Sequence, residues 1–228
     1  MKNNIDWDEI NKVVNTQIYS GLSGKLLQLT HKQLAAFGNK FQKQQDNVLE
    51  IGAGQGEHFP FVNRNFATYT MSDISDWGSS EISKILKTDN RVKFEKQDIQ
   101  ALTYPNNSFD RVITTCVIAH VDEPYESFLE VRRVTKNGGT CSFLVSADPS
   151  MLLRFIRAML TAPKMKKLGS PYLLINAISH RNSAGGMIEI AKHVFQQDEV
   201  QIKYFPFRVR SWNLSTHIII NVNVRENK

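Results

Sequence analysis

Short apolar runs alternate with amphipathic segments through the middle of the chain. Runs rich in valine, isoleucine and phenylalanine begin near residues 47, 67, 91, 109 and 139. Apolar positions with helical spacing separate several of them, most clearly over 79–87 and 124–136. This alternation predicts right-handed βαβ crossovers and a parallel sheet with helices on both faces. The predicted fold class is therefore α/β, a doubly wound, Rossmann-like sheet.

Further segments extend this pattern toward both termini. Helices are expected over 7–19, from Ser23 to Gly38, and over 57–66, directly after a glycine-rich loop. Past Ala147 comes an amphipathic helix, whose apolar positions are Leu152, Phe155, Ile156, Met159 and Leu160. A helix near 184–196 and two extended runs, over 200–210 and 215–224, then predict a terminal antiparallel strand pair.

These patterns divide the chain into four expected parts. They are N-terminal helices that form a lid (1–45), a sheet core (46–148), a helical insertion (149–183) and a C-terminal helix with the strand pair that completes the sheet (184–228). The chain has 228 residues, 41% of them hydrophobic and 22% charged, which is typical of a globular protein with one core. No apolar run approaches the ~20 residues that span a bilayer, and the polar N-terminus is unlike a signal peptide, so a cytoplasmic location is expected.

The excess positive charge lies in one segment. Residues 149–181 contain no acidic residue, whereas the rest of the chain carries 22 basic and 22 acidic residues; the basic residues of the segment are Arg154, Arg157, Lys164, Lys166, Lys167 and Arg181. Such a local field attracts phosphates, nucleic acid or membrane headgroups. A solvated surface that binds nothing is the alternative.

Glycines follow the first strand at positions 52, 54 and 56. They allow a tight turn and a close approach of the backbone to a ligand. The dinucleotide fingerprint G-x-G-x-x-G would need a glycine where Glu57 stands, and the lysine of a nucleoside triphosphate loop is missing. Asp73 ends the second strand, 21 residues after Gly52, where a carboxylate can accept both hydroxyls of a ribose. Asp98 follows the third strand and could accept from an adenine amine.

Four segments resemble the class I S-adenosylmethionine-dependent methyltransferases, in particular the branch called methyltransferase type 11. They are VLEIGAGQGEH, YTMSDIS, QDIQALTYPNNSFDRVIT and VIAHVDEPYESFLEVRRVTKNGGT. The chain departs from that branch at Ala119, where it usually has a histidine, and at Asn137, where it has a proline. The resemblance covers about 46–146 and implies a seventh strand inserted beside the others.

The resemblance also implies S-adenosylmethionine as the cofactor. The residues expected to contact it are Glu50, Gly52, Ala53, Gly54, Gly56, Asp73, Ile74, Asp98, Ile99, Cys116 and Tyr19. Tyr19 could close over the sulfonium cation, and core packing is the alternative for its ring. The motifs match the residues that bind the cofactor and carry almost no information about the acceptor. Neither cysteine, Cys116 or Cys141, belongs to a CxxC or a Cys/His cluster, so no metal site is expected.

Methyl transfer from a sulfonium is an in-line displacement, and an oxygen or nitrogen acceptor must also lose a proton. His120, just past the fourth strand, is the expected catalytic base, with His180 as the second candidate. The basic segment favours a small anionic acceptor, such as an anionic sugar or a glycan precursor. RNA methylation is an alternative, and so is a non-catalytic scaffold that binds S-adenosylmethionine and docks on a membrane through the amphipathic helix.

Overall fold

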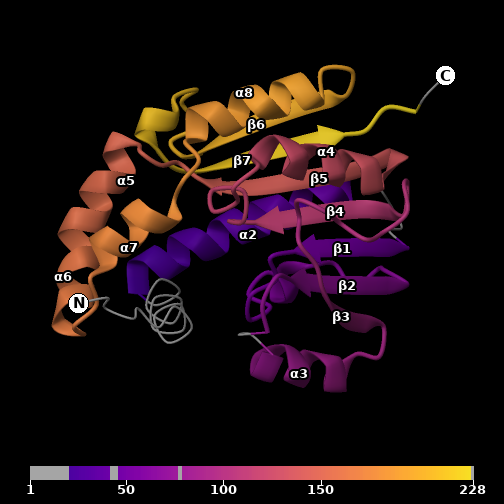
Figure 1. Cartoon of the computed structure of the whole chain (residues 1–228), viewed down its shortest axis with the longest axis horizontal. Coiled ribbons are helices and arrows are strands. Elements are labelled where there is room, and N and C mark those ends of the chain that lie inside the picture. Colours follow the sequence, from indigo (N-terminus) through magenta and orange to yellow (C-terminus); the bar gives the residue numbers. More distant parts are fainter. Residues whose placement is uncertain (1–20, 42–45, 77–78, 227–228) are drawn as a thin grey trace.

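The computed structural model describes residues 21–41, 46–76 and 79–226. Its centre is a seven-stranded sheet in the order β3-β2-β1-β4-β5-β7-β6 (Figure 1). The strands are β1 (Asn47–Ile51), β2 (Thr68–Asp73), β3 (Val92–Lys96), β4 (Phe109–Thr115), β5 (Thr135–Ser146), β6 (Glu199–Pro206) and β7 (Ser215–Asn223). Pairs among the first five are parallel, and β7 pairs antiparallel with both β5 and β6. The predicted fold class, including the inserted seventh strand, is confirmed.

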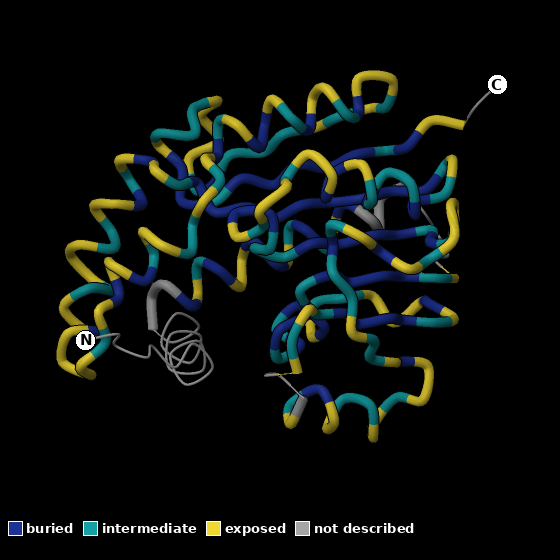
Figure 2. Tube along the Cα trace, in the orientation of Figure 1, coloured by how far each residue is buried: buried dark blue, intermediate teal, exposed yellow. Residues whose placement is uncertain are grey.

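Helices cover both faces of the sheet. On one face α4 (Pro124–Val134) and α8 (Ala184–Val194) pack together, and their apolar residues form one core with Phe143 and Ile220. On the other face α2 (Gly21–Phe41) and α3 (Ser79–Thr88) contribute to a second core around Tyr69. Central strands are therefore buried on both sides, which explains their continuous apolar runs (Figure 2).

The segment after β5 forms a helical layer beside the sheet. It contains α5 (Met151–Ile156), a five-residue π-helix η2 (Arg157–Thr161), α6 (Ala162–Lys167) and α7 (Tyr172–Ser179). Figure 1 shows these helices beyond one end of the strands, where they extend away from the sheet. The amphipathic helix expected over 151–160 is thus the start of a longer helical segment. None of the described helices is long and apolar enough to cross a bilayer.

Two expected helices differ from the structure. The segment 57–66 forms only a short 3₁₀ turn, η1 (Phe59–Phe61), because Pro60 lies in it and Phe59 packs on Tyr69, with ring centroids 5.2 Å apart. Helix α2 begins before Ser23 and passes through Gly38 to Phe41, so the expected bounds were wrong. The helix expected over 7–19 lies outside the described residues.

A buried carboxyl lies beneath the end of β1. Glu50 is fully buried, and the Tyr69 hydroxyl donates to its Oε2 at 2.6 Å. Burial raises the pKa of Glu50 from 4.5 to about 8, against the lowering effect of the Tyr69 hydrogen bond. The folded protein therefore holds this carboxyl in its neutral form at pH 7.

We predict that Glu50 makes the protein less stable as the pH rises. Because the folded pKa is raised, the contribution of Glu50 is fully present below pH 4.5 and is lost as the pH passes through about 8. Between pH 4.5 and 7 the free energy of unfolding of the parent should fall by ~2–3 kcal/mol more than that of Glu50→Gln, because each pH unit contributes about 1.4 kcal/mol. Urea unfolding at several pH values measures it, with Glu81→Gln on α3, whose side chain is 45% exposed, as the control. An unchanged slope in Glu50→Gln would contradict the prediction.

Candidate functional site

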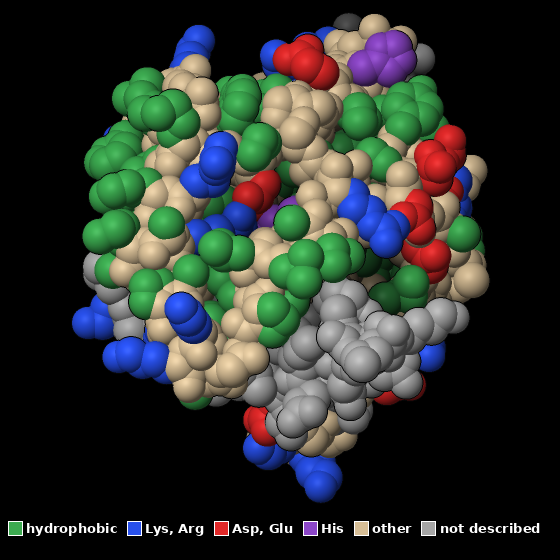
Figure 3. All heavy atoms as spheres, turned by 60° about the vertical axis from the view of Figure 1, so that its left-hand side comes forward, with side chains coloured by type: hydrophobic (Ala, Val, Ile, Leu, Met, Phe, Trp, Pro, Cys, Tyr) green, Lys and Arg blue, Asp and Glu red, His purple; other side chains and the backbone are tan. Residues whose placement is uncertain are grey.

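A cavity of about 750 Å³ opens at the carboxyl ends of the parallel strands. Its walls come from the loops after β1, β2, β3 and β4, from α2, and from the inner sides of α5 and α7. In open α/β sheets this edge is where ligands bind, at the point where the strand order reverses. Here the reversal lies between β1 and β4, which are neighbours in the sheet but not in sequence. The space-filling view shows charged and histidine side chains inside a hollow (Figure 3).

The glycine loop has backbone conformations that require glycine. Gly52, Gly54 and Gly56 have φ angles of +71°, +57° and +83°. A Cβ on Gly52 would lie 1.9 Å from Cγ2 of Val117, and one on Gly56 would lie 2.6 Å from Cδ1 of Ile85. The loop therefore turns sharply at the end of β1 and passes directly over neighbouring side chains.

Two carboxylates stand at the neighbouring strand ends, as the sequence predicts. Asp73 Oδ2 accepts from the Gly54 backbone N–H at 3.1 Å, which joins the end of β2 to the glycine loop. Asp98 Oδ1 accepts from the Gln100 backbone N–H at 2.9 Å. Both line the cavity together with Ile74, whose side chain is 62% exposed there. Carboxylates next to an exposed apolar side chain fit a ribose and a flat base.

The structure separates the expected cofactor contacts into two groups. Seven line the cavity: Gly52, Gly54, Asp73, Ile74, Asp98, Ile99 and Cys116. Glu50, Ala53 and Gly56 are buried and are not part of its lining. Tyr19 lies outside the described residues. The contacts with S-adenosylmethionine stay predictions.

Cys116 has an unusual backbone at the end of β4. Its φ is +59°, in the left-handed region, and its N–H donates to the Leu144 carbonyl at 2.8 Å. Residues held in this region carry local strain that clusters at ligand sites. Burial raises the pKa of the Cys116 thiol to about 12, so the group is neutral at pH 7. We infer no nucleophilic role for it.

The two candidate histidines meet in the same cavity. His120 and His180 are 60 residues apart in sequence, and their ring centroids lie 4.6 Å apart in an edge-to-face arrangement. His180 donates from Nδ1 to Asp148, which also accepts from Arg157, with Nη2 to Oδ2 at 2.8 Å. These two partners, Arg157 and His180, hold the pKa of Asp148 well below its usual range against the opposing effect of burial. Asp148 is therefore ionised and acts only as an acceptor.

Their hydrogen bonds fix the tautomers of both rings. His120 Nδ1 lies 2.9 Å from the Ser179 carbonyl oxygen, which can only accept, so Nδ1 carries the proton. The same reasoning applies to His180 with Asp148. In both rings Nε2 is then free to accept a proton from another molecule. Desolvation of the ring within the cavity and the neighbouring His180 lower the pKa of His120, although the residue is exposed at the surface, so His120 is neutral at pH 7.

The cations of the basic segment divide into two groups. Arg157 and Arg181 line the cavity, and each forms an ion pair, with Asp148 and Asp122 respectively. The other four do not line it; they are Arg154, Lys164, Lys166 and Lys167, all exposed. Most of the excess charge of the segment therefore faces outward.

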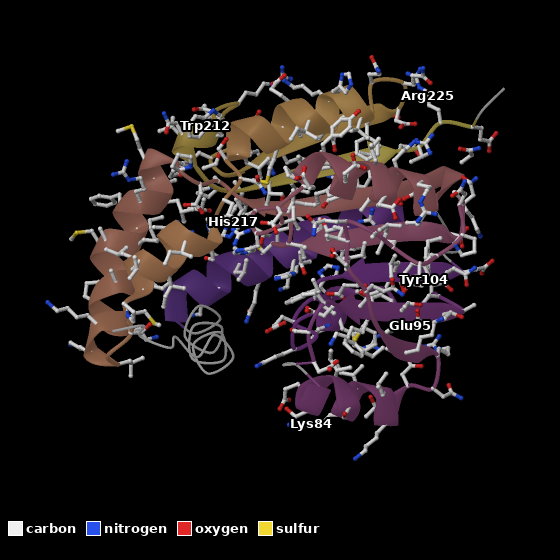
Figure 4. The ribbon with its side chains drawn as sticks, viewed as in Figure 1. Lys84, Glu95, Tyr104, Trp212, His217 and Arg225 are labelled. Carbon is white, nitrogen blue, oxygen red and sulfur yellow. The ribbon has the colours of Figure 1, made fainter. Side chains whose placement is uncertain are left out.

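Asp148 and His217 are two residues of this region that the sequence motifs do not predict. Asp148 follows β5 just as Asp73 ends β2, so its place after a buried strand was an available signal. His217 is on β7, whose antiparallel register places it opposite Ser146 at the cavity (Figure 4). Burial lowers the pKa of His217 to about 4. Its position depends on strand pairing across 70 residues, which the local sequence does not reveal. Within the described part of the chain, no group of His, Cys, Asp and Glu could hold a metal ion.

Residues 49–143 match the family model described as a methyltransferase domain. Over 134 residues the chain is 31% identical to the demethylmenaquinone methyltransferase of Clavibacter sepedonicus, an alignment that covers 55% of this chain and 53% of that protein. The chain spans about half, or less, of the length of the first curated relatives that it matches.

Solved structures share the fold at low identity. One is the N-methyltransferase NodS of Bradyrhizobium japonicum in complex with S-adenosyl-L-homocysteine, with a TM-score of 0.64, 13% identity, and coverage of 94% of this chain and 98% of that one. Another is the CurJ carbon methyltransferase, with a TM-score of 0.64, 16% identity, and coverage of 93% and 58%. These matches identify residues 49–143 as similar to methyltransferase domains, and the solved structures share the fold.

Proposed function

We propose that this protein transfers a methyl group from S-adenosylmethionine to an oxygen or nitrogen atom of a small molecule. The observation that carries the proposal is that one cavity joins the glycine loop and Asp73 to the histidine pair His120 and His180. S-adenosylmethionine supplies an electrophilic methyl group on a sulfonium. What the chain must add is alignment of the acceptor, exclusion of water and a place for the acceptor's proton.

We assign proton acceptance to His180 rather than to His120. Its Nδ1 donates to Asp148, which fixes the ring and stands ready to stabilise the positive charge that a proton on Nε2 creates. The Nδ1 atom of His120 donates to the Ser179 carbonyl oxygen, which carries no full charge, and the lowered pKa of His120 makes it a weak base. Its ring packs edge-on against His180 and supports the orientation of that ring. His120 is in this proposal a positioning residue.

The lining supports an acceptor with an apolar portion. Leu153, Ile156, Tyr172 and Ile175 line the same cavity as the two histidines. Both cations on the described lining, Arg157 and Arg181, are already paired with carboxylates. The anionic sugar or glycan precursor that the composition favours would therefore have to place its charge near Arg181, whose side chain is 55% exposed. The reactive end of the acceptor is a neutral hydroxyl or amine.

Asp73→Ala should weaken the binding of S-adenosylmethionine about thirtyfold, since loss of a charge-assisted hydrogen bond to the ribose costs ~2 kcal/mol. Calorimetry with S-adenosylhomocysteine measures the affinity. Asp76→Ala is the matched control, because this aspartate is in the same loop and its side chain is 67% exposed. Equal affinities of Asp73→Ala and the parent would remove the ribose role from Asp73.

Replacement of the histidines should separate their roles. We expect His180→Ala to lower the rate of methyl transfer about 10²-fold or more, with the affinity for S-adenosylhomocysteine unchanged. Asp148→Asn should lower the rate and alter its pH profile, while His120→Gln should lower it less. Single-turnover rates on a panel of hydroxyl and amine acceptors measure this, and the exposed His193→Ala on α8 is the control. Full turnover by His180→Ala, with a large loss in His120→Gln, would return the base to His120.

A further inference from the structure

The outward side of the helical insertion is a broad apolar surface. We define the α5–α7 face by its exposed apolar residues: Met151, Phe155, Met159, Leu160, Leu168, Leu173, Leu174 and Ile178. Met151, Phe155 and Met159 are each more than 60% exposed. Figure 3, in which this side of the molecule is turned forward, shows hydrophobic side chains gathered along it. Contiguous exposed apolar patches in folded proteins mark sites of interaction.

The spacing of these residues makes the face continuous. Met151, Phe155 and Met159 recur every four residues and form one row along the helix, while Leu153 and Met165 are buried on the opposite side. A groove of about 920 Å³ between α5 and α7 is lined by Met151, Phe155 and Leu173 together. The two helices therefore present their apolar side chains on the same side of the molecule.

Positive charge is interspersed with these apolar residues. Arg154 also lines the groove, and Lys164, Lys166 and Lys167 are exposed on α6. No acidic residue occurs in 149–181. Arg157 and Arg181, which line both the groove and the cavity, form ion pairs with Asp148 and Asp122. Asp148, which also lines the groove, is paired with Arg157 and His180. A surface that combines exposed apolar side chains with an excess of positive charge complements a layer of anionic headgroups over acyl chains.

The loop after β6 adds the same combination of side chains next to this face. The Met151 backbone N–H donates to Asn213 Oδ1 at 3.2 Å, so the loop lies against the first turn of α5. This loop exposes the apolar residues Phe207, Val209 and Leu214. Two exposed arginines, Arg208 and Arg210, alternate with Phe207 and Val209 along the chain.

We propose that the α5–α7 face docks on the surface of a bilayer that contains anionic phospholipids. Apolar side chains enter the boundary between headgroups and acyl chains, and the lysines remain at the headgroups. The inner sides of the same helices line the cavity through Ile156, Tyr172 and Ile175. Docking would thus hold the acceptor part of the cavity close to the lipid surface. Lipid binding itself does not depend on methyl transfer.

The test is co-sedimentation of the protein with vesicles of phosphatidylcholine and phosphatidylglycerol, with pure phosphatidylcholine for comparison. The parent should bind the mixed vesicles, and added salt should weaken the binding, because exposed charges are screened. Lys166→Gln/Lys167→Gln should lower the partition coefficient about 25-fold, because ~1 kcal/mol per lysine is about fivefold for each of the two. Phe155→Ser/Met159→Ser should lower it about tenfold or more, because two apolar side chains no longer enter the boundary between headgroups and acyl chains. All the residues changed are exposed.

Matched controls lie elsewhere on the surface. Leu129→Ser on α4 removes an exposed apolar side chain. Lys84→Gln/Lys87→Gln removes two exposed charges from α3, which lies next to the β3 edge of the sheet and apart from α6 (Figure 1), as the labelled Lys84 shows (Figure 4). Both should bind vesicles as the parent does. Equal binding of the parent to both kinds of vesicle, or equal loss in the face and control variants, would overturn the proposal. The proposal would also be overturned if the parent formed a dimer and bound no vesicles, while Phe155→Ser/Met159→Ser was monomeric.

A fluorescent probe reports which face of the protein contacts the bilayer. A polarity-sensitive dye on Met159→Cys should shift to shorter wavelength with mixed vesicles, whereas the same dye on Lys84→Cys should not. Burial raises the pKa of both native thiols, Cys116 and Cys141, to about 12, so they label slowly at neutral pH. Labelling of the parent protein measures how much dye attaches to these two native cysteines. A shift at Lys84→Cys alone would place a different face on the lipid.

Discussion

The missing side chain of Gly52 is the constraint on which the site depends. A Cβ at this position would overlap Val117, which lies in the connection between β4 and α4. Because Gly52 leaves that space, the connection passes directly across the end of β1. It carries Cys116 and His120 into the same cavity as the glycine loop. The close approach of two segments 65 positions apart thus makes one site from the ends of two strands.

Charge compensation shapes the other half of the cavity. A buried charge is costly unless it is paired, and Asp148 has both Arg157 and His180 as partners. The pairing fixes the tautomer of His180 and also neutralises a cation that the composition would assign to substrate binding. Arg181 is paired in the same way with Asp122. The remaining positive charge of the segment is outside, among exposed apolar side chains, where it cannot act on a molecule inside the cavity.

Local sequence predicted most of the sheet because its central strands are buried on both faces. Short runs rich in apolar and β-branched residues mark them, and a glycine follows β1 while an aspartate ends β2. The helix expected after the glycine loop does not form, since Phe59 and Phe66 pack on Tyr69 and hold the chain in a short turn. Packing against a distant strand outweighed the local helical pattern there. The same reason applies to Glu50, which the motif suggests as a cofactor contact and the structure buries against Tyr69.

The sequence by itself determined the parallel sheet, the glycine loop, and the carboxylates Asp73 and Asp98, because each of these depends on residues within one strand and the turn that follows it. Only the tertiary structure decided the pairing of Asp148 with His180, the arrival of His217 from β7, and the division of the basic segment into inward and outward cations. These features depend on which side of a helix faces the cavity and on which strands are neighbours. Such relations arise when distant segments pack together, so no local pattern of residues specifies them.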